Sequence, residues 1–263
     1  MHDAIADVEL LLSAPETDVA ALYDRAAARY DHFRDLWLRL AGAPAEQALI
    51  DDLRSVLRPG SRVLDAGCGT GALAREVLLI EPTAQLTLLD LSPVMLARAA
   101  DLPGDHVVGS VLELPFTDDT FDIVISGWVI ETVPDAIAAV REYLRVINPD
   151  GYVLYTFCSL PNGFLSRAGS AWLRAAVGRS FAGDFIPEKR TPWHDCDRSH
   201  RLHAHGGLVT EVSLRKCCHV GAPVVPATGI PGASQDCDAA GQSELHAAGT
   251  RREEGPGEHR KSR

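Results

Sequence analysis

The strongest constraint on the fold is the stretch from Ser61 to Ala72, which reads SRVLDAGCGTGA. Its first part, Arg62–Asp65, predicts a short buried strand, and a helix over about 72–80 is expected after the glycines. A strand that breaks into glycines before a helix lets bare backbone approach a ligand, because no side chains stand in the way. The start of the helix also offers unpaired backbone N–H groups. The stretch therefore predicts a ligand site at the end of a strand.

Three kinds of ligand fit such a loop to different degrees. A phosphate-binding P-loop needs Gly-Lys-Ser/Thr after its second glycine, and no lysine lies here. The spacing Gly67-x-Gly69-x-x-Ala72 satisfies the dinucleotide fingerprint, with alanine in the last place. Asp65, however, ends the strand two residues before Gly67, where its carboxylate favours a cationic ligand and repels a pyrophosphate. S-adenosylmethionine carries a sulfonium and an α-ammonium, so it suits Asp65 better than a nicotinamide dinucleotide does.

Val63–Gly71 resembles the V-L-D-x-G-C-G-T-G motif of class I S-adenosylmethionine-dependent methyltransferases. A second strand, Gln85–Asp90, ends in a carboxylate 19 residues after Gly71, the spacing at which an acidic residue meets the ribose hydroxyls. The alternative role for Asp90 is to cap the next helix, which Ser92-Pro93 is expected to start. The resemblance implies that S-adenosyl-L-methionine is the cofactor and that it contacts Asp65, Gly67, Cys68, Gly69, Gly71, Asp90, Leu91, Met95, Ser110, Val111, Ser126 and Gly127.

Five strands that alternate with helices predict an α/β fold with a parallel, doubly wound sheet. The resemblance adds two strands, the last of them antiparallel beside the fifth, and residues 208–217 fit that last strand. We therefore expect a mostly parallel, seven-stranded, Rossmann-like sheet with helices on both faces. Gly42 and Pro44 are expected to break a helix that starts at about Asp18, and a turn is expected at Asn148–Gly151. The expected five strands cover residues 62–65, 85–90, 106–109, 121–126 and 152–158.

The 263 residues, 46% of them hydrophobic, are enough for one large core. We expect a methyltransferase domain over residues 1–220, with a helical N-terminal segment (1–58), a cofactor-binding core (59–160) and a C-terminal substrate-side part (161–220). Residues 221–263 carry clusters of proline, glycine and alanine and few aliphatic side chains, which predicts a disordered tail.

Three further features concern the substrate side and the cover of the site. The phrase LYDRAAARYD at 22–31 resembles the tyrosine-containing N-terminal helix of ubiquinone/menaquinone-type methyltransferases, which often covers the cofactor; plain aromatic packing is the alternative. In that family the fourth strand ends near the methyl group, which makes Trp128 and Glu131 the candidate catalytic residues. Each has a simpler interpretation, a packing aromatic for Trp128 and a solvated carboxylate for Glu131. Ser110 stands where the family usually has an acidic residue near the adenine, so backbone groups of Ser110 and Val111 are expected to contact the ring instead.

A segment rich in histidine and cysteine, residues 193–205, admits several interpretations. Its spacing matches no zinc pattern, so we expect no metal and favour a polar loop followed by a sixth strand; a wall of the substrate site is the other alternative. The potential ligands are His194, Cys196, His200, His203 and His205.

Charge and composition narrow the function. The net charge of −11 argues against a general nucleic-acid binder. No apolar run approaches a membrane span, no signal peptide is evident and the six cysteines form no disulfide framework, so we expect a cytoplasmic protein. The sequence predicts an S-adenosylmethionine-dependent methyltransferase that acts on a small-molecule acceptor of unknown identity. The alternatives are an NAD(P)-dependent Rossmann oxidoreductase, which lacks a Tyr-x-x-x-Lys pair here, and a non-catalytic S-adenosylmethionine-binding protein. The oligomeric state is not predicted.

Overall fold

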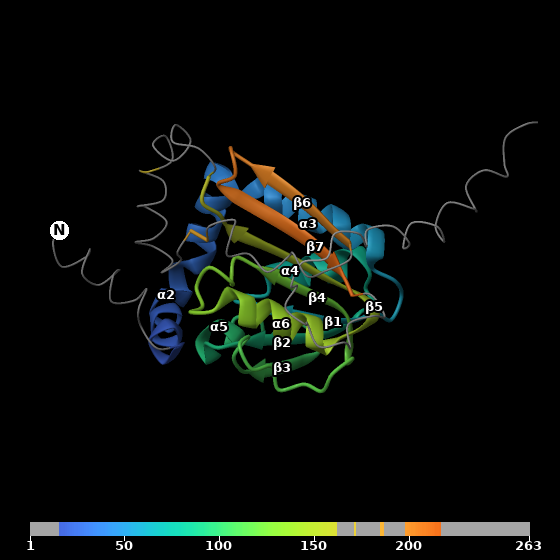
Figure 1. Ribbon diagram of the computed structural model, residues 1–263. Coiled ribbons are helices and arrows are strands. Elements are labelled where there is room, and N and C mark those ends of the chain that lie inside the picture. The colour runs from blue at the N-terminus through green and yellow to red at the C-terminus, as the bar shows by residue number, and fades with distance from the viewer. Residues whose placement is uncertain (1–15, 162–170, 172–184, 187–197, 217–263) are drawn as a thin grey trace, which may run out of the picture. The chain divides into compact units, whose positions relative to one another are not determined.

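The computed structural model describes residues 16–161, 171, 185–186 and 198–216 (Figure 1). All of these residues belong to residues 1–221, the first of two units into which the chain divides. The predicted tail, residues 221–263, lies outside the described residues, as do His194, Cys196 and most of residues 161–197.

One seven-stranded sheet forms the centre of the described structure, in the order β3-β2-β1-β4-β5-β7-β6. Strands β1 to β5 run parallel to one another, and β7 pairs antiparallel with both β5 and β6. The predicted seven-stranded sheet with an antiparallel last strand is therefore confirmed. The bounds are β1 Arg62–Ala66, β2 Gln85–Asp90, β3 Asp105–Val108, β4 Phe121–Gly127, β5 Ile147–Cys158, β6 Arg198–Ala204 and β7 Val209–Arg215.

Helices cover both faces of this sheet. The bounds are α2 Glu16–Trp37, a π-helical turn η1 Leu38–Gly42, α3 Ala43–Val56, α4 Ala72–Ile80, α5 Pro93–Ala97 and α6 Ala136–Val146. Val63 of β1 packs with residues of α3, α4 and α5 on one face, and its neighbour Leu64 packs with residues of α6 on the other. Successive strand residues point to opposite faces, so a strand that is covered on both faces needs apolar side chains on both, as Val63 and Leu64 provide in β1.

Gly42 and Pro44 do not end the helical segment as predicted. The backbone stays helical from α2 through η1 into α3. Pro44 falls in the first turn of α3, directly after the π-helical turn, a position in which proline is common. Gly42 packs against the ring of Trp37, because a Cβ there would lie 2.8 Å from the indole nitrogen. The two residues permit close packing rather than a break.

The predicted turn at Asn148–Gly151 is also wrong, because β5 begins at Ile147 and includes it. Here the backbone of Asp150 and Gly151 exchanges hydrogen bonds with Lys216, just beyond β7 (3.0 Å or less). This pairing with a segment distant in sequence outweighs the local turn signal, although Asp150 keeps a turn-like φ of 66°.

Segment 193–205 contains the predicted sixth strand, β6. His203 contacts the Thr210 hydroxyl through Nδ1 (2.9 Å), a cross-strand pair between β6 and β7. Among the residues that the structure describes, no group of three or more His, Cys, Asp or Glu side chains is placed to hold a metal ion. Nor does any helix in these ranges combine the length and the apolar character that crossing a bilayer requires.

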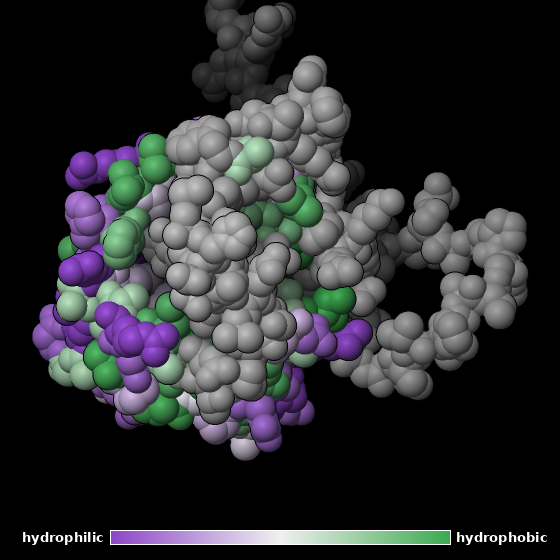
Figure 2. Space-filling view, turned by 90° about the vertical axis from the view of Figure 1, so that its left-hand side faces the viewer, coloured by the Kyte–Doolittle hydropathy of each residue, from purple (hydrophilic) through white to green (hydrophobic). Residues whose placement is uncertain are grey.

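The described surface mixes hydrophilic and hydrophobic side chains on the face that Figure 2 shows. Exposed apolar residues that are scattered in this way are usual for protein surfaces. The large apolar side chains that are exposed come from five different elements: Leu36, Leu40, Leu79, Val94 and Val108.

Candidate functional site

The glycine loop between β1 and α4 is the structural centre of the candidate site. Gly67, Gly69 and Gly71 all have positive φ, at 77°, 55° and 81°, a region that residues with a Cβ enter at a cost. The N–H groups of Gly67 and Cys68 both donate to the Leu89 carbonyl, at 2.8 and 2.9 Å, which fixes the loop to the end of β2. The loop therefore holds its bare backbone at the carboxyl edge of the sheet.

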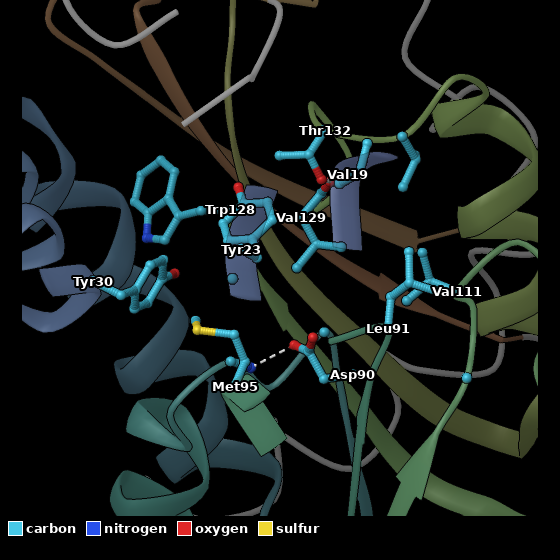
Figure 3. Close-up of a pocket in the computed structure, with 15 residues that line it drawn as sticks. Val19, Tyr23, Tyr30, Asp90, Leu91, Met95, Val111, Trp128, Val129 and Thr132 are labelled. Atoms are coloured by element: carbon cyan, nitrogen blue, oxygen red, sulfur yellow. Dashed lines mark hydrogen bonds between the residues drawn. The ribbon is translucent and has the colours of Figure 1, made fainter. Parts of the chain in front are cut away.

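Asp90, at the end of β2, joins the glycine loop to the start of α5. One carboxylate oxygen accepts the Gly69 N–H at 2.7 Å (the dashed line in Figure 3), and the other accepts the Ser92 N–H at 2.8 Å. Burial raises the pKa of this carboxyl above its ordinary value, an effect that the N–H bonds oppose. Ser92 caps α5 as predicted, because its hydroxyl accepts the Met95 N–H. Asp90 thus orders the loop and also borders the pocket.

A pocket of about 600 Å³, including its open mouth, lies over this edge of the sheet (Figure 3). The Asp90 carboxylate lies at one side, close to Leu91 and Met95, and the aromatic rings of Tyr23, Tyr30 and Trp128 lie at another. The full lining is Val19, Tyr23, Tyr30, Gly67, Gly69, Asp90, Leu91, Met95, Gly109, Val111, Gly127, Trp128, Val129, Thr132 and Val133.

A smaller hollow of about 310 Å³ adjoins this pocket and shares Tyr30, Gly67, Gly127 and Trp128 with it. Asp65 lines the hollow, and its carboxylate accepts the Ala74 N–H at 3.1 Å. Only 1% of Asp65 is exposed, and burial raises its pKa to about 7. The buried carboxyl is therefore poised to ionise when a cation binds beside it. The other lining residues are Arg34, Glu46, Cys68, Thr70, Ala72 and Leu73.

Helix α2 forms one wall of the larger pocket through Val19, Tyr23 and Tyr30. Polar contacts at two points attach this helix to the site. The Ser92 hydroxyl donates to Asp24, while Asp31 accepts both the Thr70 hydroxyl at 2.7 Å and the Arg98 guanidinium at 2.9 Å. Of the two sequence interpretations of this helix, the structure therefore favours a cover over the glycine loop.

Some predicted site residues do not line either pocket. The Ser110 hydroxyl accepts the Leu112 N–H at 3.0 Å. Ser126 points into the core, where its hydroxyl donates to the Ala66 carbonyl at 2.8 Å and contacts the Tyr143 hydroxyl at 3.0 Å. Gly71 packs against the segment that follows α5, because a Cβ there would lie 2.5 Å from Leu102 and 3.1 Å from Ala99.

Glu131 is not the solvated carboxylate that the sequence suggested. It is 6% exposed, and one of its oxygens accepts the Cys158 N–H at 3.2 Å, at the end of β5. Burial raises its pKa to about 7. The residues that follow it, Thr132 and Val133, line the larger pocket, whereas Glu131 itself does not. Trp128, by contrast, lines both pockets.

Sequence reasoning brought most of the lining together but missed several members. Motif spacing points to the strand ends and the residues shortly after them, and it predicted Gly67, Gly69, Asp90, Leu91, Met95, Val111, Gly127 and Trp128. Arg34 and Glu46 gave no signal, because only the tertiary fold brings α2 and α3 to the glycine loop. Tyr23 and Tyr30 did give a sequence signal, because both belong to the phrase LYDRAAARYD at 22–31.

Replacing Gly67 by alanine is expected to lower the free energy of unfolding by roughly 1–3 kcal/mol, the cost of a left-handed non-glycine residue. The added Cβ would also lie 2.4 Å from a methyl carbon of Val129, which must then shift toward the pocket. Thermal unfolding of the free protein measures the loss of stability. Unfolding in the presence of S-adenosylhomocysteine shows whether the shift of Val129 also weakens binding. The matched control is Gly60→Ala, which has a similar φ of 76° but no atom within 4 Å of the new Cβ. An equal loss in both variants would mean that crowding by Val129 contributes nothing.

Comparison with known proteins finds methyltransferases. The methyltransferase domain family matches residues 64–155. The malonyl-[acyl-carrier protein] O-methyltransferase of Serratia marcescens is 34% identical over 175 residues, 64% of this chain and 62% of the relative. The chain thus spans somewhat less than two thirds of that protein. The ubiquinone/menaquinone biosynthesis C-methyltransferase of Hahella chejuensis is 30% identical over 198 residues, 72% of this chain and 78% of the relative.

Solved structures share the fold at lower identity. The phosphoethanolamine N-methyltransferase 2 of Haemonchus contortus, solved with S-adenosylhomocysteine, superposes with a TM-score of 0.53 at 18% identity, over 65% of this chain and 52% of that one. The [4+2]-cyclase SpnF superposes with a TM-score of 0.51 at 19% identity, over 65% and 80%. Such low identities show the common fold alone.

The fold and the sequence relatives together define the class of this protein. The chain belongs to the S-adenosylmethionine-dependent methyltransferase family.

Proposed function

We propose that the two adjoining pockets together hold S-adenosylmethionine, with the adenosine in the larger and the methionine part in the smaller. The observation that carries this proposal is a pair of carboxylates beside bare glycine backbone, the partly buried Asp90 in the larger pocket and the buried Asp65 in the smaller one. Asp90 would accept the ribose hydroxyls with charge-assisted hydrogen bonds. Met95 and Leu91 would flank the adenine, and Val111 would border it.

Asp65 supports a cationic rather than a phosphate-bearing cofactor. Its carboxylate is buried in the smaller hollow, where a pyrophosphate would meet a like charge and an ammonium an opposite one. Gly67 and Gly69 leave room that a side chain would occupy, since a Cβ on Gly69 would already lie 3.4 Å from Met95. The nicotinamide-dependent alternative therefore lacks support from the charges in the site.

We infer further that the acceptor is a small molecule that enters beside Trp128, Thr132 and Val133. Bound S-adenosylmethionine supplies an electrophilic methyl group. The chain's own part is to orient the reactants and exclude water, which can account for much of such a rate enhancement. Trp128 is the stronger of the two candidate catalytic residues, because it lines both pockets and Glu131 lines neither. The names of the relatives, a malonyl-carrier O-methyltransferase and a quinone-pathway C-methyltransferase, leave open whether oxygen or carbon is methylated.

The division of the chain is likewise a proposal. Residues 1–220 would form the methyltransferase domain, with the cofactor core in 59–160 and part of the acceptor site in 161–220. Residues 221–263 would contribute nothing to cofactor binding.

Calorimetric titration tests the proposed cofactor site directly. We expect wild-type protein to bind S-adenosylhomocysteine and S-adenosylmethionine but not NAD. Because both kinds of cofactor contain adenosine, the ribose contact alone does not discriminate between them, and Asp65 is the group that should. Tighter binding of NAD than of S-adenosylhomocysteine would contradict the assignment. Methyl transfer from labelled S-adenosylmethionine to a panel of quinols, phenols and malonyl thioesters then identifies the acceptor.

A further inference from the structure

Trp128 has a backbone conformation that is costly for a bulky residue. It follows β4 directly and has a φ of 61°, in the left-handed region. Its N–H donates to the Thr156 carbonyl of β5 at 3.0 Å, which fixes the peptide in place. The other described non-glycine residues with positive φ are Asp119, Asp150 and His205, types that tolerate this region better. The strained backbone turns the indole of Trp128 toward both pockets.

Two residues from distant helices hold this indole. Its Nε1–H donates to Oε2 of Glu46, in α3, at 3.1 Å. Its ring meets the ring of Trp37, at the end of α2, edge to face with centroids 5.5 Å apart. Figure 3 shows the indole beside Tyr30, on the side of the pocket away from Val111. The wall that the two pockets share is therefore set by contacts with α2 and α3.

Glu46 also forms an ion pair with Arg34, and both residues line the smaller hollow. Its second oxygen, Oε1, accepts the Arg34 guanidinium at 2.6 Å, in an ion pair whose side chains are 17% and 10% exposed. Both carboxylate oxygens are thus engaged, one by Trp128 and one by Arg34. At 8% exposure, Glu46 would be a costly residue to bury without such partners. Its position is explained by this double contact.

We propose that Glu46 is a positioning residue, which aims the Trp128 indole and so fixes the shape of the wall between the cofactor's methionine part and the acceptor. This inference rests on the proposed cofactor site. Glu46 acts through Trp128 and Arg34, without touching the reacting atoms. A purely structural role would stabilise the fold and leave the orientation of the indole and the binding of ligand unchanged.

The test compares Glu46→Ala, Glu46→Gln, Trp128→Phe and the double variant Glu46→Ala/Trp128→Phe, with Gln47→Ala as a control on the exposed side of α3. Glu46→Gln keeps an oxygen that can accept the indole N–H, and Trp128→Phe removes that N–H while keeping an aromatic ring. Protein labelled with 5-fluorotryptophan gives one fluorine resonance for each of the four tryptophans, and the Trp128→Phe variant identifies the resonance of Trp128. The affinity for S-adenosylhomocysteine is measured in parallel.

We expect Glu46→Ala to shift or broaden the Trp128 resonance and to weaken S-adenosylhomocysteine binding by about tenfold or more, as for the loss of a hydrogen bond to a charged group. Glu46→Gln should restore most of the resonance position, and the losses from Glu46→Ala and Trp128→Phe should not add in the double variant. An unmoved resonance with unchanged affinity in Glu46→Ala would overturn the inference, as would fully additive losses. Wild-type protein that does not bind S-adenosylhomocysteine would instead refute the proposed cofactor site.

Discussion

Replacing Asp90 by alanine is expected to weaken S-adenosylhomocysteine binding about 30- to 1,000-fold, because two charge-assisted hydrogen bonds to the ribose are lost, roughly 2–4 kcal/mol. The structure adds a second reason. The same carboxylate accepts the Gly69 and Ser92 N–H groups, so its removal also releases the glycine loop. Asp90→Asn should lose less than alanine, but its amide –NH₂ would face a backbone N–H at one of these two positions.

The ribose contact and the ordering of the loop can be separated with a modified ligand. The 2′-deoxy analogue of S-adenosylhomocysteine lacks one of the proposed hydroxyl partners. Wild-type protein should bind it more weakly than the parent compound, and the Asp90→Ala variant should bind the two equally. Asp101→Ala removes an exposed carboxylate that pairs with Arg75 and serves as the control, with no change expected. Equal discrimination by wild type and Asp90→Ala would show that Asp90 only orders the loop.

The elements that the sequence predicted well are those that local chemistry determines. The helix after the glycines runs over Ala72–Ile80 and β2 over Gln85–Asp90, both as expected. In each case the signal is contiguous: an apolar run, then glycines or a carboxylate, then a helix start with its cap. These rules act within a few residues, so a single sequence contains them in full.

The features that could not be predicted from the sequence depend on contacts between segments that are distant in the chain. Nothing near Glu131 indicates that its carboxylate is buried against the end of β5, because that contact spans 27 residues. The contact of Glu46 with Trp128 spans 82 residues. Gly42 and Pro44 carried a valid local signal for a helix break, which packing against Trp37 and placement in the first turn of α3 overruled. Tertiary packing routinely overrides such weak local preferences.

The affinity for S-adenosylhomocysteine is expected to rise with pH between about pH 6 and pH 8 and then to level off. In the free protein, burial raises the pKa of Asp65 to about 7, so a substantial fraction of this carboxyl is protonated at neutral pH. A bound ammonium favours the ionised form and lowers that pKa, so binding releases a proton. Loss of a proton on binding means tighter binding as the pH rises, by at most about tenfold per pH unit for one group.

Three variants assign this pH dependence to a residue. Asp65→Asn cannot ionise, so its affinity should fall about 10- to 100-fold at pH 8, as for the loss of a charge-assisted bond, and should be nearly flat from pH 6 to pH 8. Glu131→Gln removes the other carboxyl whose pKa burial raises to about 7, yet it should keep the slope because Glu131 lines neither pocket. The Asp90→Ala variant should bind S-adenosylhomocysteine weakly, and its affinity should still rise with pH. This result would exclude Asp90, whose pKa burial also raises in the wild-type protein, as the titrating group. Titrations in buffers of different ionisation enthalpy should show proton release near pH 7 in wild type and none in Asp65→Asn. A slope that survives in Asp65→Asn but disappears in Glu131→Gln would assign the titration to Glu131 and contradict the proposed contact of Asp65 with the ammonium.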